Sequence, residues 1–212
     1  MKKYLVIGNP IGHSLSPLIH NYWMKKYRLF DSVYEKRKVE EKNLKNIVKE
    51  IRDDKIVGVN VTVPFKKLII PFLDKLDFTA KKTESVNTIL KVKNKVIGYN
   101  TDQAGFALSM RSIFPNLNDS MKPKALQGKN ILVLGAGGVT SSIIDALENE
   151  SAKIFLSNRT KKKAEELKKK YTQIEILDWG KRPLICDIII NTTSIGLTKD
   201  EKINIDFSDC GG

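Results

Sequence analysis

The chain has 212 residues, of which 41% are hydrophobic, and its 37 Lys and Arg against 24 Asp and Glu give a formal net charge of +13. This apolar content excludes an intrinsically disordered chain, and the longest apolar runs fall far short of the ~20 residues that a membrane-spanning helix requires. Because 31 of the basic residues are Lys and only six are Arg, solvated helix faces explain the charge better than a nucleic-acid surface, which relies on Arg. A general attraction for anionic small molecules is the second explanation.

The first half of the sequence predicts strands that alternate with helices. Runs rich in apolar and β-branched residues predict strands at Tyr4–Ile7, Ser32–Lys38 and Ile56–Val63, and a hairpin of Thr88–Val92 and Lys95–Tyr99 around Asn94. Apolar residues at helical spacing predict helices at Leu15–Leu29, Glu40–Arg52 and Asp102–Ile113. Ser16 is a candidate N-cap of the first helix, and Pro17 suits its first turn.

The second half repeats this alternation after a polar stretch. The segment Asn116–Gly128 is broken by Pro123, and we interpret it as the link between two domains. Beyond it, strands are predicted at Asn130–Leu134, Lys153–Ser157 and Asp187–Asn191, and helices at Thr140–Asn149 and Lys161–Tyr171. Strands that alternate with helices of this length indicate parallel βαβ units. The predicted fold class is therefore α/β, with one domain over residues 1–110 and a second over residues 111–212.

A glycine-rich turn lies between the first strand and the first helix of the second domain. Gly135 permits a tight turn, and Gly137 lets the backbone approach a pyrophosphate at the N-terminus of the helix. Thr140 stands where the usual fingerprint has a third glycine, but the strand before the turn and the helix after it favour dinucleotide binding. The alternative is an ordinary strand-to-helix turn that uses glycine for its geometry. We predict a Rossmann-like dinucleotide-binding domain.

The residues after the next strand indicate which dinucleotide is bound. An NAD site usually has Asp or Glu there to hold the ribose 2′-hydroxyl, whereas this chain has Ser157-Asn158-Arg159-Thr160 followed by Lys161–Lys163. Arg159 and the lysines suit a dianionic 2′-phosphate, which needs charge-assisted donors. Asn158 and Thr160 could also cap the helix that follows, and the two roles are compatible. The pattern favours NADP.

Three segments of the first domain carry polar residues at strand ends or helix starts, where ligands of α/β proteins bind. They are Gly12-His13-Ser14-Leu15-Ser16-Pro17, Asn60-Val61-Thr62-Val63-Pro64-Phe65-Lys66, and Val86-Asn87-Thr88 with Asn100-Thr101-Asp102. Together with the second domain, the chain resembles the shikimate dehydrogenase family. The resemblance spans the chain from Met1 to the region of Asp209. It rests on seven motifs in the family's order: HSLSP, NVTVPFK, SVNT, NTD, GAGG, NRT and NTTSIG.

This resemblance implies a reversible, NADPH-dependent reduction of 3-dehydroshikimate to shikimate, a step of aromatic amino-acid biosynthesis. It implies that Lys66 and Asp102 are catalytic. The substrate-binding positions that it implies are Ser14, Ser16, Thr62, Lys66, Asn87 and Asp102. The cofactor-binding positions that it implies are Gly135, Ala136, Gly137, Gly138, Val139, Asn158, Arg159, Thr160 and Lys163, although the family often has Arg where Lys163 stands.

The residue types fit this chemistry. Hydride attack on a ketone places negative charge on its oxygen, which a proton donor or cation such as Lys66 can meet. Asp102 could hold the ammonium group and accept a hydrogen bond from a neighbouring hydroxyl. Ser14 and Ser16 can each donate a hydrogen bond to a substrate carboxylate. On residue type alone, a solvated lysine and a helix N-cap are the alternatives for Lys66 and Asp102.

Members of the family continue for a further strand and several helices, which supply a Tyr and a Gln to the substrate site. We therefore expect the second domain to be incomplete at its C-terminus, substrate binding to be weak and NADP binding to be better preserved. A relative that uses quinate and an inactive NADP-binding fragment are the alternative functions. We also expect a small-molecule substrate, a monomer or homodimer, and no nucleic acid, membrane or metal partner. Cys186 and Cys210 lack metal-ligand spacing, which favours a cytoplasmic location.

Overall fold

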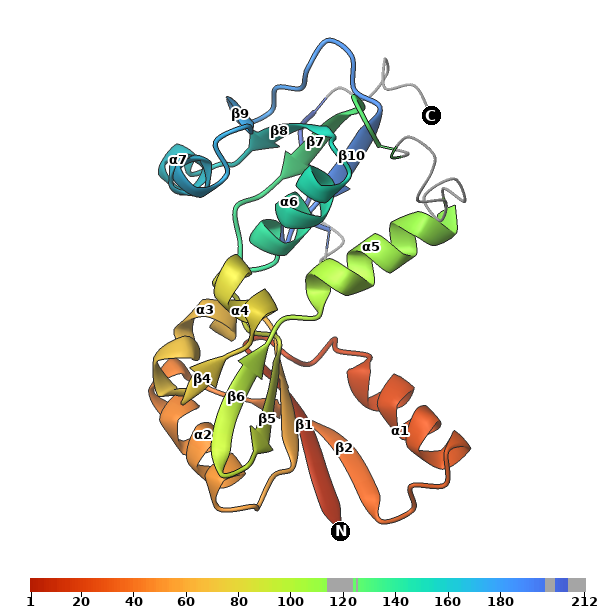
Figure 1. The fold of residues 1–212 in the computed structure, drawn as a ribbon, viewed down its shortest axis with the longest axis vertical. Coiled ribbons are helices and arrows are strands. Elements are labelled where there is room, and N and C mark those ends of the chain that lie inside the picture. The colour runs from red at the N-terminus through yellow and green to blue at the C-terminus, as the bar shows by residue number, and fades with distance from the viewer. Residues whose placement is uncertain (114–123, 125, 197–200, 206–212) are drawn as a thin grey trace. The chain divides into compact units, whose positions relative to one another are not determined.

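The computed structural model describes residues 1–113, 124, 126–196 and 201–205 (Figure 1). The chain divides into two compact units, Met1–Thr101 and Asp102–Gly212. Most of the predicted link at 116–128 lies outside the described residues. The division falls at the start of helix α5, Asp102–Ile113, and the sequence pattern places the boundary near its end. The helix joins the second unit because Phe106 and Met110 pack in that unit's core.

The first unit is built on a mixed six-stranded sheet in the order β2-β1-β3-β5-β6-β4. Its strands are β1 (Lys2–Gly8), β2 (Ser32–Lys38), β3 (Gly58–Val61), β4 (Lys75–Leu76), β5 (Thr88–Val92) and β6 (Lys95–Tyr99). β1 pairs in parallel with both β2 and β3. β5 runs antiparallel to β3 and to β6, and the short β4 is parallel to β6. The predicted α/β class is confirmed.

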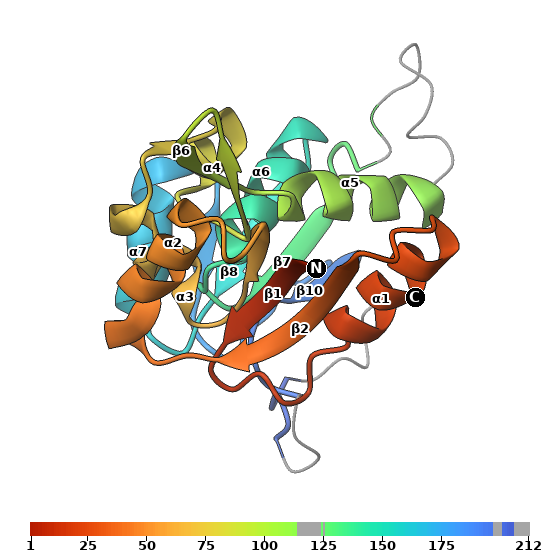
Figure 2. The same ribbon diagram turned by 90° about the horizontal axis from the view of Figure 1, so that it is seen from below.

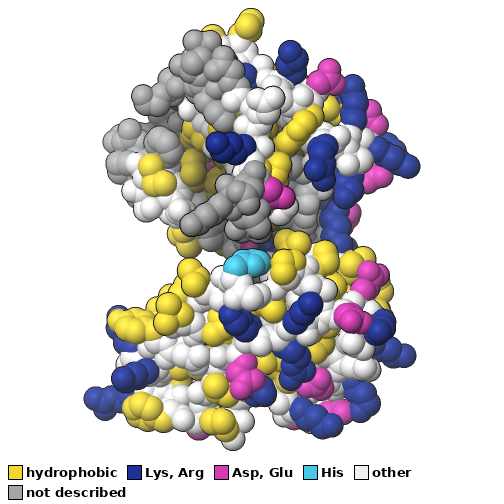
Figure 3. All heavy atoms as spheres, turned by 180° about the vertical axis from the view of Figure 1, so that it is seen from behind, with side chains coloured by type: hydrophobic (Ala, Val, Ile, Leu, Met, Phe, Trp, Pro, Cys, Tyr) yellow, Lys and Arg dark blue, Asp and Glu magenta, His cyan; other side chains and the backbone are white. Residues whose placement is uncertain are grey.

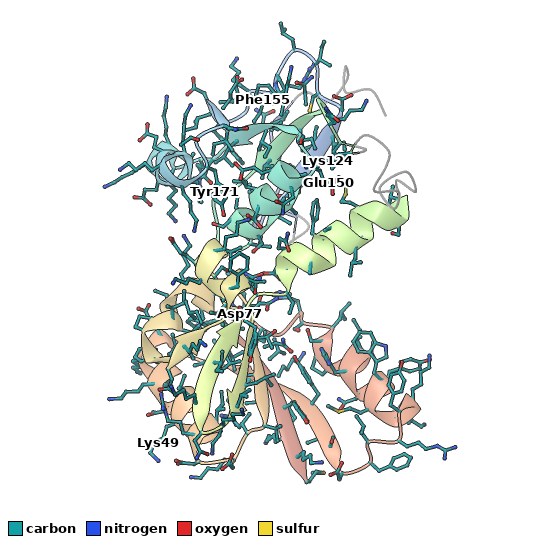
Figure 4. The ribbon with its side chains drawn as sticks, viewed as in Figure 1. Lys49, Asp77, Lys124, Glu150, Phe155 and Tyr171 are labelled. Carbon is teal, nitrogen blue, oxygen red and sulfur yellow. The ribbon has the colours of Figure 1, made fainter. Side chains whose placement is uncertain are left out.

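Helices cover this sheet on both faces, as Figures 1 and 2 show for α1 and α2. The helices are α1 (Ser16–Lys26), α2 (Leu44–Arg52), α3 (Phe65–Leu68) and α4 (Phe78–Thr83), with short 3₁₀ turns at Glu41–Asn43 and Ile70–Phe72. α2 buries the apolar residues whose spacing predicts it, namely Leu44, Ile47, Val48 and Ile51. Asp77, labelled in Figure 4, caps α4 because its side chain accepts the backbone N–H of Ala80 at 2.9 Å.

The helix α1 differs from α2 in burying none of its residues. Leu18, Tyr22 and Trp23 are exposed, and Figure 3 shows hydrophobic side chains gathered along the edge of the first unit where α1 lies. The prediction that Ser16 is the N-cap is wrong. Leu15 occupies the cap position without a side-chain hydrogen bond, and Ser16 is already helical ahead of Pro17. The helix also ends at Lys26, before the predicted Leu29.

The second unit contains a parallel four-stranded sheet in the order β10-β7-β8-β9. Its elements after α5 are β7 (Asn130–Leu134), α6 (Thr140–Asn149), β8 (Lys153–Ser157), α7 (Lys161–Lys170), β9 (Glu175–Leu177) and β10 (Ile188–Asn191). Side chains of α5, α6 and α7 join one core cluster against the sheet. The Tyr171 hydroxyl, labelled in Figure 4, donates to the Ser141 carbonyl at 3.1 Å and ties the end of α7 to α6. The Rossmann-like arrangement is confirmed.

Candidate active site

The ends of β1 and β3 meet at one edge of the first sheet. The backbone N–H of Thr62 donates to the Ile7 carbonyl at 2.9 Å, and the N–H of Asn9 donates to the Val63 carbonyl at 3.0 Å. Glycine is needed at Gly8, because a Cβ there would lie 2.6 Å from Thr62 Cγ2. The close packing of the two strand ends therefore places Thr62 and the segment after it at this edge of the sheet.

Lys66 lies in the short helix α3, directly after Pro64 and Phe65. The Phe65 side chain is buried at 2% exposure and anchors this turn in the core, whereas Lys66 is half-buried. The Lys66 carbonyl accepts the backbone N–H of Val86 at 2.8 Å. The backbone of Lys66 is thus hydrogen-bonded to the segment that directly precedes β5.

Asn87 is held by a network of hydrogen bonds at the same edge. Its carbonyl accepts the backbone N–H of Val61 at 2.8 Å. Its side chain donates to Thr101 Oγ1 at 2.9 Å and accepts the Thr101 backbone N–H at 3.1 Å. Asn60 Nδ2 donates to the Asn87 carbonyl at 3.2 Å and to Thr88 Oγ1 at 3.0 Å. The sequence pattern does not single out Asn60 and Thr101 as supports of the site, although both stand inside the motifs that carry the resemblance.

Ser14 and Ser16 lie on one turn before and at the start of α1. The backbone N–H of Ser16 faces Ser14 Oγ at 3.4 Å, and both residues are half-buried. The Tyr34 hydroxyl donates to Asn60 Oδ1 at 2.6 Å. Burial raises the pKa of Tyr34 to about 12, and a hydrogen bond with the Ser16 side chain acts in the opposite direction. Tyr34 therefore joins β2 to the hydrogen-bond network around Asn87 through Asn60.

Five predicted site residues of the first unit are half-buried. They are Ser14, Ser16, Thr62, Lys66 and Asn87. Asp102, also half-buried, directly follows Thr101 in the chain and begins α5 in the second unit. Half-burial suits binding residues, since a ligand can reach them while the protein fixes their direction.

In the second unit, the two glycines Gly135 and Gly137 of the glycine turn have different surroundings. Gly135 has φ +104°, and a Cβ there would lie within 2.8 to 3.1 Å of atoms of Thr192 and Thr193. A Cβ at Gly137 would meet only the Thr192 carbonyl, at 3.9 Å, and Gly137 is exposed. Gly135 is therefore required by the fold, while Gly137 leaves open space beside the N-terminus of α6. Ala136, Gly138 and Val139 complete this turn.

The segment after β8 lies beside the glycine turn. Asn158 Oδ1 accepts the backbone N–H of Ala136 at 3.0 Å, and its Nδ2 donates to the Thr160 carbonyl at 2.7 Å. Thr160 occupies the N-cap position of α7 but makes no side-chain cap bond. Arg159 and Lys163 are exposed cations. An open glycine cradle next to exposed cations, with no carboxylate between Ser157 and Lys163, fits a dinucleotide that carries a 2′-phosphate.

Among the residues that the structure describes, no group of three or more His, Cys, Asp or Glu is placed to hold a metal ion. No helix within the same residues has the length and apolar character to cross a membrane.

Comparison with known proteins identifies the family. The profile described as "Shikimate dehydrogenase substrate binding domain" matches residues 6–89, and that described as "Shikimate / quinate 5-dehydrogenase" matches residues 117–197. The chain is 51% identical to shikimate dehydrogenase (NADP(+)) of Pelagibacter ubique over 207 residues, which cover 97% of this chain and 74% of the relative. It is 41% identical to the enzyme of the same name from Aquifex aeolicus, over 94% of this chain and 71% of that enzyme.

Solved structures agree with these sequence matches. The crystal structure of shikimate dehydrogenase from Aquifex aeolicus superposes with a TM-score of 0.85 at 39% identity, over 98% of this chain and 74% of that one. The structure of the Thermus thermophilus enzyme in complex with NADP(H) and shikimate gives a TM-score of 0.78 at 30% identity, over 93% of this chain and 70% of that one. These matches confirm the predicted fold, the predicted oxidoreductase class and NADP as the family's cofactor. The chain belongs to the shikimate dehydrogenase family.

Proposed function

We propose that this chain catalyses the reversible, NADPH-dependent reduction of 3-dehydroshikimate to shikimate, the reaction that serves aromatic amino-acid biosynthesis. The observation that carries the proposal is the hydrogen-bonded edge of the first sheet, where the Lys66 backbone meets Val86 beside Asn87. Such an edge presents a cation, an amide and hydroxyls together. A small, polyhydroxylated carboxylate with a ketone needs those groups in its binding site.

Lys66 is the residue that we assign to proton transfer. Bound NADPH supplies the hydride that reduces the ketone carbon. The ketone oxygen gains negative charge during that step, and the Lys66 ammonium group stabilises the charge and donates a proton. We assign Asp102 as its partner carboxylate, which holds the ammonium group in place and accepts a hydrogen bond from a substrate hydroxyl.

The other polar residues of the first unit bind and orient the substrate. The hydroxyls of Ser14 and Ser16 donate hydrogen bonds to its carboxylate, because both residues lie on one turn. Thr62 and Asn87 bind its ring hydroxyls. The Asn87 side chain can act as a donor and acceptor of fixed direction, because its hydrogen bonds with Thr101 restrict its rotation. Orientation of this kind lowers the entropic part of the barrier.

The second unit binds the cofactor in this proposal. The backbone from Gly135 to Val139 accommodates the pyrophosphate, with Gly137 providing space and the N-terminus of α6 providing favourable electrostatics. Asn158, Arg159, Thr160 and Lys163 form the site of the adenosine 2′-phosphate, with Arg159 as its principal cation. Asn158 acts there mainly through the backbone, since its side chain bridges Ala136 and Thr160.

We propose that the first domain, predicted over residues 1–110, binds the substrate and that the second, predicted over residues 111–212, binds the cofactor. Helix α5 goes with the cofactor domain, because Phe106 and Met110 pack in its core. The profile match named for substrate binding, at residues 6–89, supports the first assignment. A cytoplasmic location, a monomeric or homodimeric state and the lack of a nucleic-acid partner belong to the same proposal. The Lys-dominated basic composition supports the last of these.

The test is a comparison of substrates with the purified 212-residue chain. NADPH oxidation is followed with 3-dehydroshikimate, and NADP reduction is followed with shikimate and with quinate. The proposal expects turnover with 3-dehydroshikimate and shikimate and a lower kcat/KM with quinate. A higher kcat/KM with quinate would assign the chain to the quinate-using relatives. NADPH binding by fluorescence titration without turnover on any of the three would identify an NADP-binding protein without activity.

A further inference from the structure

The side chain of Thr140 lies inside the glycine turn, at the position where the usual dinucleotide fingerprint has a third glycine. Thr140 is the first residue of α6 and is 0% exposed. Its Oγ1 accepts the backbone N–H of Gly137 at 2.9 Å and lies 2.9 Å from Thr192 Oγ1. Thr192 follows β10, so this contact joins the turn after β7 to the end of the neighbouring parallel strand.

The distances give the two hydroxyls one consistent direction. The Thr192 hydroxyl lies 2.7 Å from the Leu134 carbonyl, its shortest contact with an acceptor, and donates there. Thr140 then donates to Thr192 and accepts from Gly137. Both hydroxyls also lie near the Gly135 carbonyl, at 3.2 and 3.3 Å, and these contacts are longer than the hydrogen bonds named above. The hydrogen bonds therefore run from the Gly137 N–H through the hydroxyls of Thr140 and Thr192 to the Leu134 carbonyl, and each donor has an acceptor.

This chain of hydrogen bonds fixes the direction of the Gly137 peptide. Its N–H points at Thr140, while the side where a Cβ would stand remains open. Gly137 therefore contributes space for an anion and not a hydrogen bond to it. Without the Thr140 hydroxyl the Gly137 N–H loses its partner in the protein. The peptide would then turn toward water, into the space that the pyrophosphate needs.

We propose that Thr140, together with Thr192, is a positioning residue that holds the glycine turn in the shape that accepts the pyrophosphate of NADP. The inference rests on the proposed function of the second unit. It assigns a role to a hydroxyl that stands in place of a glycine. It predicts an effect mainly on the pyrophosphate, because the cations Arg159 and Lys163 lie on the segment after β8, whose Asn158 bonds to Ala136 and not to Gly137.

The test compares Thr140→Val, which keeps the shape and removes the hydroxyl, with Thr140→Ser, which keeps the hydroxyl. Fluorescence titration measures the Kd for NADPH, and competition measures the Kd for 2′-AMP, which has the 2′-phosphate but no pyrophosphate. Thr140→Val is expected to raise the NADPH Kd about tenfold and to leave the 2′-AMP Kd unchanged. Thr140→Ser is expected to restore the NADPH Kd. In steady state the KM for NADPH should rise while kcat and the KM for 3-dehydroshikimate are retained.

A matched control removes a buried threonine hydroxyl from the first unit. Thr83 is 1% exposed and donates to the Thr79 carbonyl at 2.8 Å. Thr83→Val should lower the Tm, as Thr140→Val also can, but should leave the NADPH Kd unchanged. Thr192→Val should raise the NADPH Kd, and adding Thr140→Val to it should raise the Kd by less than the product of the two single effects.

Either of two results with the Thr140→Val chain would overturn the inference. One is a Thr140→Val chain with a lowered Tm and an NADPH Kd equal to that of the wild type. The other is an equal rise in the Kd values for NADPH and 2′-AMP, which would show a general loss of structure. A wild-type chain that does not bind NADPH would overturn the proposed function and this inference with it, whereas wild-type binding beside an unaffected Thr140→Val chain would overturn this inference alone.

Discussion

The backbone N–H of Val86 donates to the carbonyl of Lys66 across 2.8 Å, so the lysine is fixed to the segment that carries Asn87. The neighbouring Phe65 side chain is buried in the core of the first unit. The backbone of the lysine therefore has little freedom, although its side chain is only half-buried. A fixed backbone with a half-buried side chain suits a residue that must meet the oxygen of a bound ketone.

Lys66→Ala is therefore expected to lower kcat by about 10²–10⁴-fold, because it removes the proton donor of the transition state. The KM for 3-dehydroshikimate should change much less. Lys67→Ala is the matched control, since Lys67 is the next residue of the same helix and is exposed. Steady-state kinetics of both variants decide the point, and equal effects of the two substitutions would remove Lys66 from the mechanism.

Arg159→Ala should change cofactor preference. The 2′-phosphate is present in NADPH and absent from NADH, and loss of a charge-assisted pair lowers affinity by roughly ten- to a hundred-fold. The NADPH Kd should rise by that factor and the NADH Kd should stay nearly constant. Lys162→Ala, a neighbouring exposed cation, serves as the control. A similar loss for both cofactors would show that Arg159 acts elsewhere.

Two glycine substitutions should separate folding from binding at the glycine turn. Gly135→Ala is expected to destabilise the chain by about 1–3 kcal/mol or more, because the positive φ and the contacts with Thr192 and Thr193 both oppose a Cβ. Gly137→Ala should leave the Tm almost unchanged and raise the NADPH Kd at least tenfold, since its Cβ would occupy the open space. Thermal unfolding and NADPH titration measure the two effects. A Gly137→Ala chain with unaltered NADPH Kd would contradict the assignment of that space to the pyrophosphate.

Acid should destabilise the first unit through Asp74. The Arg52 guanidinium donates to both Asp74 oxygens, at 2.9 and 2.8 Å, and the Val96 N–H donates at 2.7 Å, so the pKa of this carboxyl lies below its usual value. A lowered folded-state pKa stabilises the fold above the unfolded pKa of about 3.9, and this contribution is lost as the pH falls through the folded-state pKa.

Asp74→Asn should therefore cost about 1 kcal/mol at pH 7, discounted for the partial exposure of the pair. It should also reduce the loss of stability as the pH falls below the usual carboxyl pKa of about 3.9. Urea unfolding at pH 7 and at acid pH measures both quantities. An Asp74→Asn chain whose stability falls with acid as steeply as the wild type would contradict this role.

The regular part of the fold can be predicted from the sequence, because periodicity and turn residues agree there. The hairpin of β5 and β6 has its predicted bounds, and Lys93 and Asn94 take the positive φ angles, 47° and 62°, that a tight hairpin turn requires. The sequence pattern does not divide the segment between Phe65 and Thr83 into elements. Its helices and strand are too short for periodicity to show, and Pro71 interrupts the apolar run that contains them.

The sequence indicates candidate site residues, but it does not indicate the residues that support them. Polar motifs at strand ends indicate Thr62, Lys66 and Asn87, and the structure ties the backbone of each by hydrogen bonds at one sheet edge. The partners that hold them come from distant strands, so no local pattern pairs Asn60 with Tyr34, 26 residues away. In the sequence Thr140 is only a missing glycine, because the pattern cannot show that its hydroxyl faces Thr192 across 52 residues.

Hydride transfer from NADPH to the ketone carbon of 3-dehydroshikimate can be followed directly. The measurement uses NADPH deuterated at C4 of the nicotinamide, on each face in turn, with NMR detection of the product. We expect shikimate with one deuterium at the new carbinol carbon, from one labelled face only, and no such product from the Lys66→Ala chain on the same timescale. NADPH that binds but yields no deuterated shikimate, or product formed equally well without Lys66, would contradict the proposed function.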